Sequence, residues 1–80
     1  MHKIHNQRQL HEAIAGGQHE FRILLRYGLY SAKTIHLSAN GRFLVENHID
    51  GVKQRLTDRQ LYTESNIGTA MERGAFIVSP

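Results

Sequence analysis

The stretch KTIHLSANGRFLVENHIDGVKQRLT, residues 33–57, decides the fold because apolar and polar residues alternate in it around two turn signals. Alternation with a period of two is typical of strands that have one buried face. The turn signals are Asn40-Gly41 and Asp50-Gly51, and both dipeptides favour tight hairpins. The stretch therefore predicts three antiparallel strands connected as a meander.

The hydrophobic pattern also predicts the register of the first hairpin. A two-residue turn would place Ile35 on the face opposite Val45, because a one-residue slip moves every side chain to the other face. A three-residue loop, 39–41, instead pairs Ile35 with Val45. It also pairs Leu37 with Phe43 and so keeps all four apolar side chains on one face. We therefore predict the three-residue loop.

For the second hairpin, a two-residue turn at Asp50-Gly51 pairs Ile49 with Val52. It also sets Glu46 opposite Arg55, a favourable cross-strand ion pair. The core face predicted by both registers consists of Ile35, Leu37, Phe43, Val45, Ile49, Val52 and Leu56. The opposite face consists of His36, Arg42, Leu44, Glu46, His48, Lys53 and Arg55.

A fourth strand precedes this meander in EFRILLRY, residues 20–27, which alternates in the same way. One face of it carries Phe21, Ile23, Leu25 and Tyr27, and the other carries Arg22, Leu24 and Arg26. The link 28–32 is ambiguous and is compatible with a bulge. The apolar, β-branched segment AFIVS, 75–79, predicts a last strand beside the first, with its direction left open.

Capping signals predict the helices. Asn6 and Gln9 have the spacing of a capping box, and so do Thr57 and Gln60. Apolar residues at helical spacing follow each box, and Gly16 begins the stop signal of the first helix. The sequence thus predicts one α+β domain over residues 1–80 in the order αββββααβ. Its sheet is a four-stranded antiparallel meander plus a C-terminal strand, with the helices packed on one face.

The segment TESNIGTAMERG, 63–74, could be an anion site or a capped helix, because helix N-termini bind phosphate. A phosphate-binding loop also has glycines before the helix and a lysine that reaches the phosphate. Here Gly68 lies inside the helix, and no lysine follows Lys53. We therefore interpret the segment as a helix capped by Ser65 or Thr63.

The sequence predicts no catalytic residue, cofactor site or metal site. The chain has no cysteine, and no nucleophile–base–acid set can be placed on one face by spacing. Six histidines are present, but the predicted register separates His36 from His48 by about 13 Å. His11 and His19 have no partner at ligand spacing. A non-enzymatic protein is therefore expected.

Composition favours a cytoplasmic protein without a membrane partner. No apolar run approaches the roughly 18 residues of a membrane span. The first ten residues lack the apolar core of a signal peptide. The basic excess lies in residues 21–56, with six basic side chains against two acidic ones.

Two kinds of partner fit this pattern. The first expectation is a protein-interaction or self-association module that uses Leu24 and Leu44 on the outer sheet face. The alternative is nucleic-acid binding through a basic face, although no stacking aromatic is securely placed there. The candidate contacts of that alternative are Arg22, Arg26, Arg42, Lys53 and Arg55.

The segments LHEAI, LLRYGL and LYTESNIGTAMERGAFI resemble a family of small uncharacterised bacterial α+β proteins. The resemblance extends over nearly the whole chain and implies a single compact domain from a bacterium. It includes no motif of known chemistry, so it implies no active site, cofactor or partner.

Overall fold

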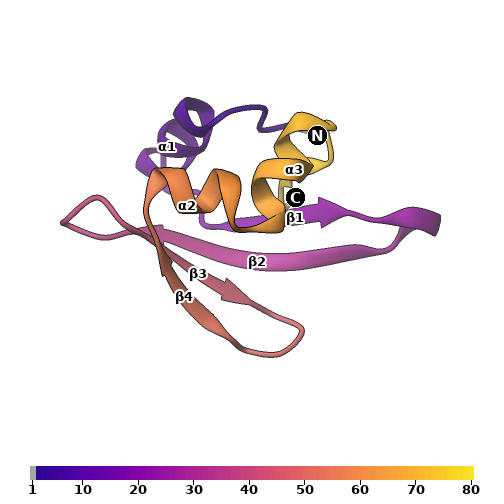
Figure 1. The fold of residues 1–80 in the computed structure, drawn as a ribbon. Coiled ribbons are helices and arrows are strands. Elements are labelled where there is room, and N and C mark those ends of the chain that lie inside the picture. Colours follow the sequence, from indigo (N-terminus) through magenta and orange to yellow (C-terminus); the bar gives the residue numbers. More distant parts are fainter. Residues whose placement is uncertain (1) are drawn as a thin grey trace.

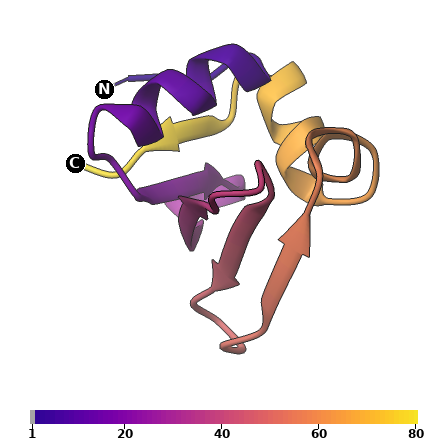
Figure 2. The ribbon, with the colours of Figure 1, turned by 90° about the vertical axis from the view of Figure 1, so that its left-hand side faces the viewer.

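The computed structural model describes residues 2–80, which form a five-stranded antiparallel sheet with three α-helices on one face (Figures 1 and 2). The spatial order of the strands is β4-β3-β2-β1-β5. The strands are β1 (Glu20–Leu24), β2 (Tyr30–Leu37), β3 (Phe43–Asn47), β4 (Lys53–Leu56) and β5 (Phe76–Val78). The helices are α1 (Gln7–Ala15), α2 (Asp58–Thr63) and α3 (Asn66–Glu72), with a 3₁₀ turn at Arg26–Gly28. The predicted order αββββααβ is confirmed, and β5 runs antiparallel to β1. We call the sheet face toward the helices the inner face and the other the outer face.

The first hairpin has the predicted register. Ile35 pairs with Val45 and Leu37 pairs with Phe43. The Ser38 N–H donates to the Arg42 carbonyl at 2.8 Å and closes the three-residue loop. Gly41 has a φ of +81°, the left-handed conformation that favours glycine at this position.

The predicted register of the second hairpin is wrong by two residues. Glu46 pairs with Lys53 rather than with Arg55, because the connecting turn has four residues, 48–51. The side chains of Asn47 and Asp50 stabilise this longer turn. The Asn47 Oδ1 accepts from the Ile49 N–H at 3.0 Å, and the Asp50 Oδ1 accepts from the Val52 N–H at 2.9 Å. Side chains that bond to nearby backbone can outweigh a two-residue turn signal.

This slip changes which residues reach the core. A shift of two residues keeps each strand's faces, so Leu56 stays buried and now lies opposite Phe43. Ile49 instead lies in the turn and Val52 directly follows it, and they are 75% and 50% exposed. Leu37, at the far end of β2, is also 38% exposed. The prediction that these three side chains are core residues is therefore wrong.

The strand predicted for residues 20–27 ends early, at Leu24. Tyr27 has a φ of +60°, which an extended strand cannot contain, and the chain reverses there in the 3₁₀ turn. Leu25 and Tyr27 are consequently exposed rather than buried. The tight turn therefore lies mostly before the ambiguous link 28–32, and β2 already begins within that link, at Tyr30.

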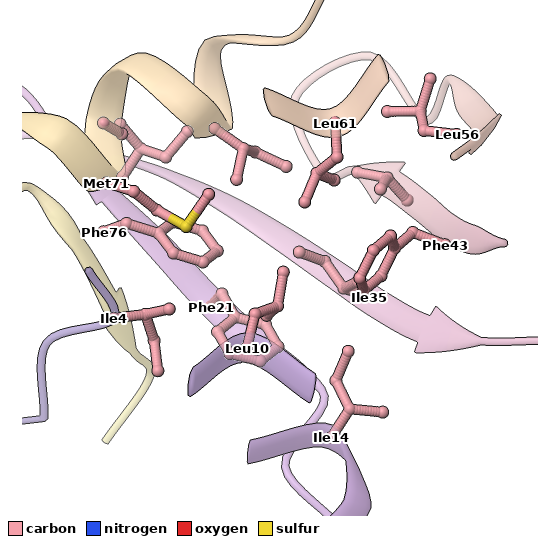
Figure 3. Packing of buried hydrophobic residues seen from close by; sticks show 14 of the residues in the cluster. Ile4, Leu10, Ile14, Phe21, Ile35, Phe43, Leu56, Leu61, Met71 and Phe76 are labelled. Atoms are coloured by element: carbon pink, nitrogen blue, oxygen red, sulfur yellow. The ribbon is translucent and has the colours of Figure 1, made fainter. Parts of the chain in front are cut away.

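Side chains from the helices and the sheet meet in a single core (Figure 3). Phe21 and Phe76 stack there with ring centroids 5.3 Å apart. The main fully buried residues are Ile4, Leu10, Phe21, Ile23, Ile35, Phe43, Leu61, Ile67, Met71 and Phe76. The Thr57–Gln60 capping box is confirmed, whereas the Gln9 side chain accepts from the His5 N–H instead of that of Asn6. Asn6 still caps α1 by accepting from the Gln9 N–H at 2.9 Å.

The two sheet edges differ. The N-terminal segment covers β5, since the Ile4 N–H donates to Phe76 and the Val78 N–H donates to His2, at 2.8 and 2.9 Å. The other edge is β4, whose Lys53, Gln54 and Arg55 are exposed. Figure 1 shows the β3–β4 hairpin extending away from the helices, so its tip lies beyond their cover.

Candidate functional site

The two leucines proposed as a protein interface lie far apart, and Leu24 packs partly against the hydrophobic core. Leu24 pairs with Tyr30 and Leu44 pairs with His36, which places them six residues apart along β2, or about 20 Å. A polar row crosses the sheet between them and consists of Glu20, Thr34, Glu46 and Lys53. Leu24 and Leu44 therefore do not belong to one apolar contact.

The five basic candidates are also dispersed. Arg22, Lys53 and Arg55 lie on the outer face, whereas Arg26 and Arg42 lie in turns at opposite ends of β2. Two carboxylates, Glu20 and Glu46, share the outer face with them. The outer face itself thus carries three basic and two acidic side chains, which gives it a weak net charge.

An exposed apolar surface lies instead at the turn between β1 and β2, which projects from the end of the sheet in Figure 1. Tyr27 is 95% exposed and Leu29 is 64% exposed, and Leu25 and Tyr30 are about half exposed. We call these four residues the apolar turn. Neighbouring large apolar side chains that all remain in solvent mark interaction sites more often than scattered ones do.

The backbone of the apolar turn is strained and its neighbours are basic. A positive φ at a non-glycine residue such as Tyr27 costs about 1–3 kcal/mol, and such strain clusters at functional sites. The guanidinium carbon of Arg22 lies 4.0 Å from the centre of the Tyr30 ring, a cation–π contact. Arg26 lies within the turn itself, and the sequence 21–32 contains no acidic residue. The surface combines apolar groups with positive charge.

The histidines are distributed differently from the prediction. His19, predicted to have no partner at ligand spacing, stacks on His36 with ring centroids 4.3 Å apart, and its Nδ1 lies 3.1 Å from the Ile35 carbonyl oxygen. His48 does not face Lys53. Its Nε2 lies 2.6 Å from the Thr34 hydroxyl and 3.6 Å from Glu20. Within residues 2–80, no three His, Asp or Glu side chains come together as metal ligands.

The segment 63–74 forms a capped helix. The Ser65 hydroxyl accepts from the Ile67 N–H at 3.2 Å, and α3 begins at Asn66, directly after Ser65. Gly68 has a packing role, because a Cβ there would lie 2.0 Å from the Tyr62 carbonyl oxygen. The close approach at Gly68 is therefore between α3 and the backbone of α2.

A buried lysine is the functional candidate that sequence reasoning missed. Lys33 pairs with Phe21 on the inner face and is only 4% exposed. It lines a cavity of about 260 Å³ between the β3–β4 hairpin and the start of α3. Burial lowers the pKa of the Lys33 ammonium, and the nearby charge of Asp50 partly opposes this. A sequence signal existed, since alternation places Lys33 on the same face as Ile35.

Comparisons with family models, curated proteins and solved structures gave no significant match. The resemblance to small bacterial α+β proteins therefore stays a prediction. No helix within residues 2–80 has the length and apolar character needed to cross a membrane.

Proposed function

We propose that this protein is a non-enzymatic interaction module whose apolar turn binds a protein segment that combines apolar and acidic side chains. The observation that supports this most directly is the exposure of Leu25, Tyr27, Leu29 and Tyr30 beside Arg22 and Arg26. The proposal keeps the predicted class of partner and moves its binding surface from Leu44 to the end of the sheet. Leu24 stays at the margin of that surface, opposite Tyr30.

The residue types suit such a contact. Tyrosine and arginine are enriched among the residues that dominate binding energy, because each combines a large contact area with directed polar groups. Arg22 is already ordered over Tyr30, so less side-chain entropy is lost when a partner binds it. The strain at Tyr27 holds its ring out of the core, where it is available to a partner.

The charge around the apolar turn specifies the partner. Neither Arg22 nor Arg26 forms an ion pair within residues 2–80, so a partner carboxylate could pair with either guanidinium group. A second copy of this chain fits less well, because two such turns would bring like charges together. Nucleic acid is the competing occupant, and the Arg22–Tyr30 pair is the contact that favours it. The exposed aliphatic Leu29 favours the protein segment.

The test is an NMR titration of ¹⁵N-labelled protein with three probes. These are a peptide rich in Leu, Phe and Asp, the same peptide with Lys in place of Asp, and a short mixed-sequence single-stranded DNA. We expect saturable shifts at residues 25–30 with the acidic peptide only. Binding to the DNA at this surface with a steep salt dependence, and none to the acidic peptide, would favour the nucleic-acid alternative. No shift at residues 25–30 with any probe would contradict the proposal.

A pair of variants separates the apolar turn from exposed apolar residues in general. Leu29→Ser should weaken binding of the acidic peptide by about tenfold or more, as expected for a residue central to a contact. Ile49→Ser is the matched control, since Ile49 is 75% exposed in a different turn. Equal losses in both variants would mean that the peptide binds exposed apolar surface without specificity.

A further inference from the structure

Lys33 has an unusual position for a charged side chain. It is 4% exposed, yet within residues 2–80 its ammonium has neither a hydrogen bond nor a carboxylate within 4.0 Å. Within residues 2–80, every side-chain nitrogen that is fully enclosed has a hydrogen-bond partner. The Lys33 Nζ must therefore reach the cavity beside it, and the cavity is where its hydrogen-bonding capacity is directed.

The cavity is small and its lining is mostly polar, which suits only a small polar molecule. Its volume of about 260 Å³ equals that of roughly nine water molecules. Amide side chains from three elements line it, Asn47 from β3, Gln54 from β4 and Asn66 from α3. Each amide offers both donors and an acceptor, so the walls can bind polar groups of either kind.

The charges in the cavity are ordered from inside to outside. The Lys33 residue is 4% exposed and only its ammonium reaches the cavity, whereas Asp50 and Glu64, which also line the cavity, are exposed. A simple anion would be attracted by Lys33 and repelled by the two carboxylates. A simple amine, which is positively charged, would be repelled by Lys33 and attracted by the carboxylates. A molecule with a carboxylate at one end and an ammonium at the other satisfies both.

We propose that this cavity binds a free α-amino acid, with its carboxylate against the Lys33 ammonium and its own ammonium toward Asp50 and Glu64. The ligand would supply the missing counter-charge of Lys33. This site lies on the inner face and does not depend on the proposed function of the apolar turn.

The fold does not need a charge at position 33. Partial desolvation of an ammonium that has no ion pair opposes folding, and a methionine would fill a similar volume without that penalty. Residues that lower stability in this way are found where function requires them. Lys33→Met should therefore raise the thermal midpoint while abolishing ligand binding.

The experiment uses protein labelled with ¹³Cε-lysine, which gives signals from only three lysines, Lys3, Lys33 and Lys53. Each standard α-amino acid is added separately at about 10 mM, a concentration that detects millimolar affinities. We expect at least one to shift the Lys33 signal and leave the other two in place. Acetate, methylamine and inorganic phosphate are the comparison probes and should bind about tenfold more weakly or not at all.

Variants complete the test. Lys33→Met should abolish amide shifts at Asn47 and Asn66 on adding the same amino acid, and Asp50→Asn should weaken them. Lys53→Met, the same substitution on the outer face, should change neither binding nor the thermal midpoint. If no amino acid moves the Lys33 signal, or if phosphate binds more tightly than every amino acid, the proposal is wrong. A fall in the thermal midpoint of Lys33→Met would likewise show that Lys33 is a structural residue.

Discussion

The inner face of the sheet has two halves that come from the same strands and differ in what covers them. Under the helices, Phe21, Ile35 and Phe43 are buried in apolar surroundings (Figure 3). Beyond the start of α3, the same face carries Lys33 and Asn47, and it opens into a polar cavity. The packed half provides stability, and the open half leaves a charged group without a partner. A small domain can thus form a polar cavity simply by ending its helical cover early.

The largest effect should follow from a change in the packed half. Phe43 is fully buried between β2 and β4, and Phe43→Ala should lower the free energy of unfolding by about 3–5 kcal/mol through lost burial and cavity formation. Chemical denaturation measures this. Val52→Ala in the open half is the control and should change stability by less than about 0.5 kcal/mol. Similar losses in the two variants would mean that the halves do not differ in packing.

The sequence predicted the packed half better than the open one, for a physical reason. Alternation and capping are local signals, and they predicted the pairing of Ile35 with Val45 and the Thr57–Gln60 box. The turn at 48–51 depends on two side chains that bond to nearby backbone, and this outweighed the Asp50-Gly51 signal.

The candidate sites were harder to predict than the fold. The predicted core face did not include Lys33, and although alternation is compatible with that position, it could not reveal that the helical cover ends near Ser65. Nor could it reveal the positive φ of Tyr27, which exposes the apolar turn, because tyrosine is a poor left-handed residue. Where the helical cover ends is set by tertiary packing, and residue types along the chain do not encode it locally.

The boundary between the two halves is the junction of α2 and α3. Gly68 allows these two helices to pack closely there. A Cβ at this position would lie 2.0 Å from the Tyr62 carbonyl oxygen, which is backbone and cannot swing aside. Gly68→Ala should therefore destabilise the protein by about 1–3 kcal/mol, despite the better helix propensity of alanine. Thermal denaturation checks this against Thr69→Ala, a control on the exposed side of the same helix. A more stable Gly68→Ala variant would show that α2 and α3 can separate at little cost.

The smallest effect should be the pH dependence that Lys33 gives to the open half. Burial lowers the pKa of its ammonium below the usual 10.5, with Asp50 opposing the shift. Between the folded and unfolded pKa values the unfolded chain binds more protons, so the stability contribution of Lys33 rises with pH in that alkaline window. The cost of desolvating the Lys33 ammonium is fully present at lower pH, where the lysine is protonated in both the folded and the unfolded chain. The stability advantage of Lys33→Met should consequently be greatest near neutral pH and shrink as the pH approaches 10.5.

Paired urea titrations of the two proteins at successive pH values measure this difference. Asp50 and Glu64 are the carboxylates that line the cavity. Asp50→Asn removes the negative charge that partly offsets the lowered pKa of Lys33, so it should increase the cost of desolvating the Lys33 ammonium and widen the pH range over which stability changes. Lys53→Met supplies the control for an exposed lysine and should give a pH-independent difference of about 0.5 kcal/mol or less. A constant advantage for Lys33→Met across the whole range would mean that the Lys33 ammonium is as well solvated as that of Lys53. The open half would then be ordinary surface, and the contrast with the packed half would be one of shape alone.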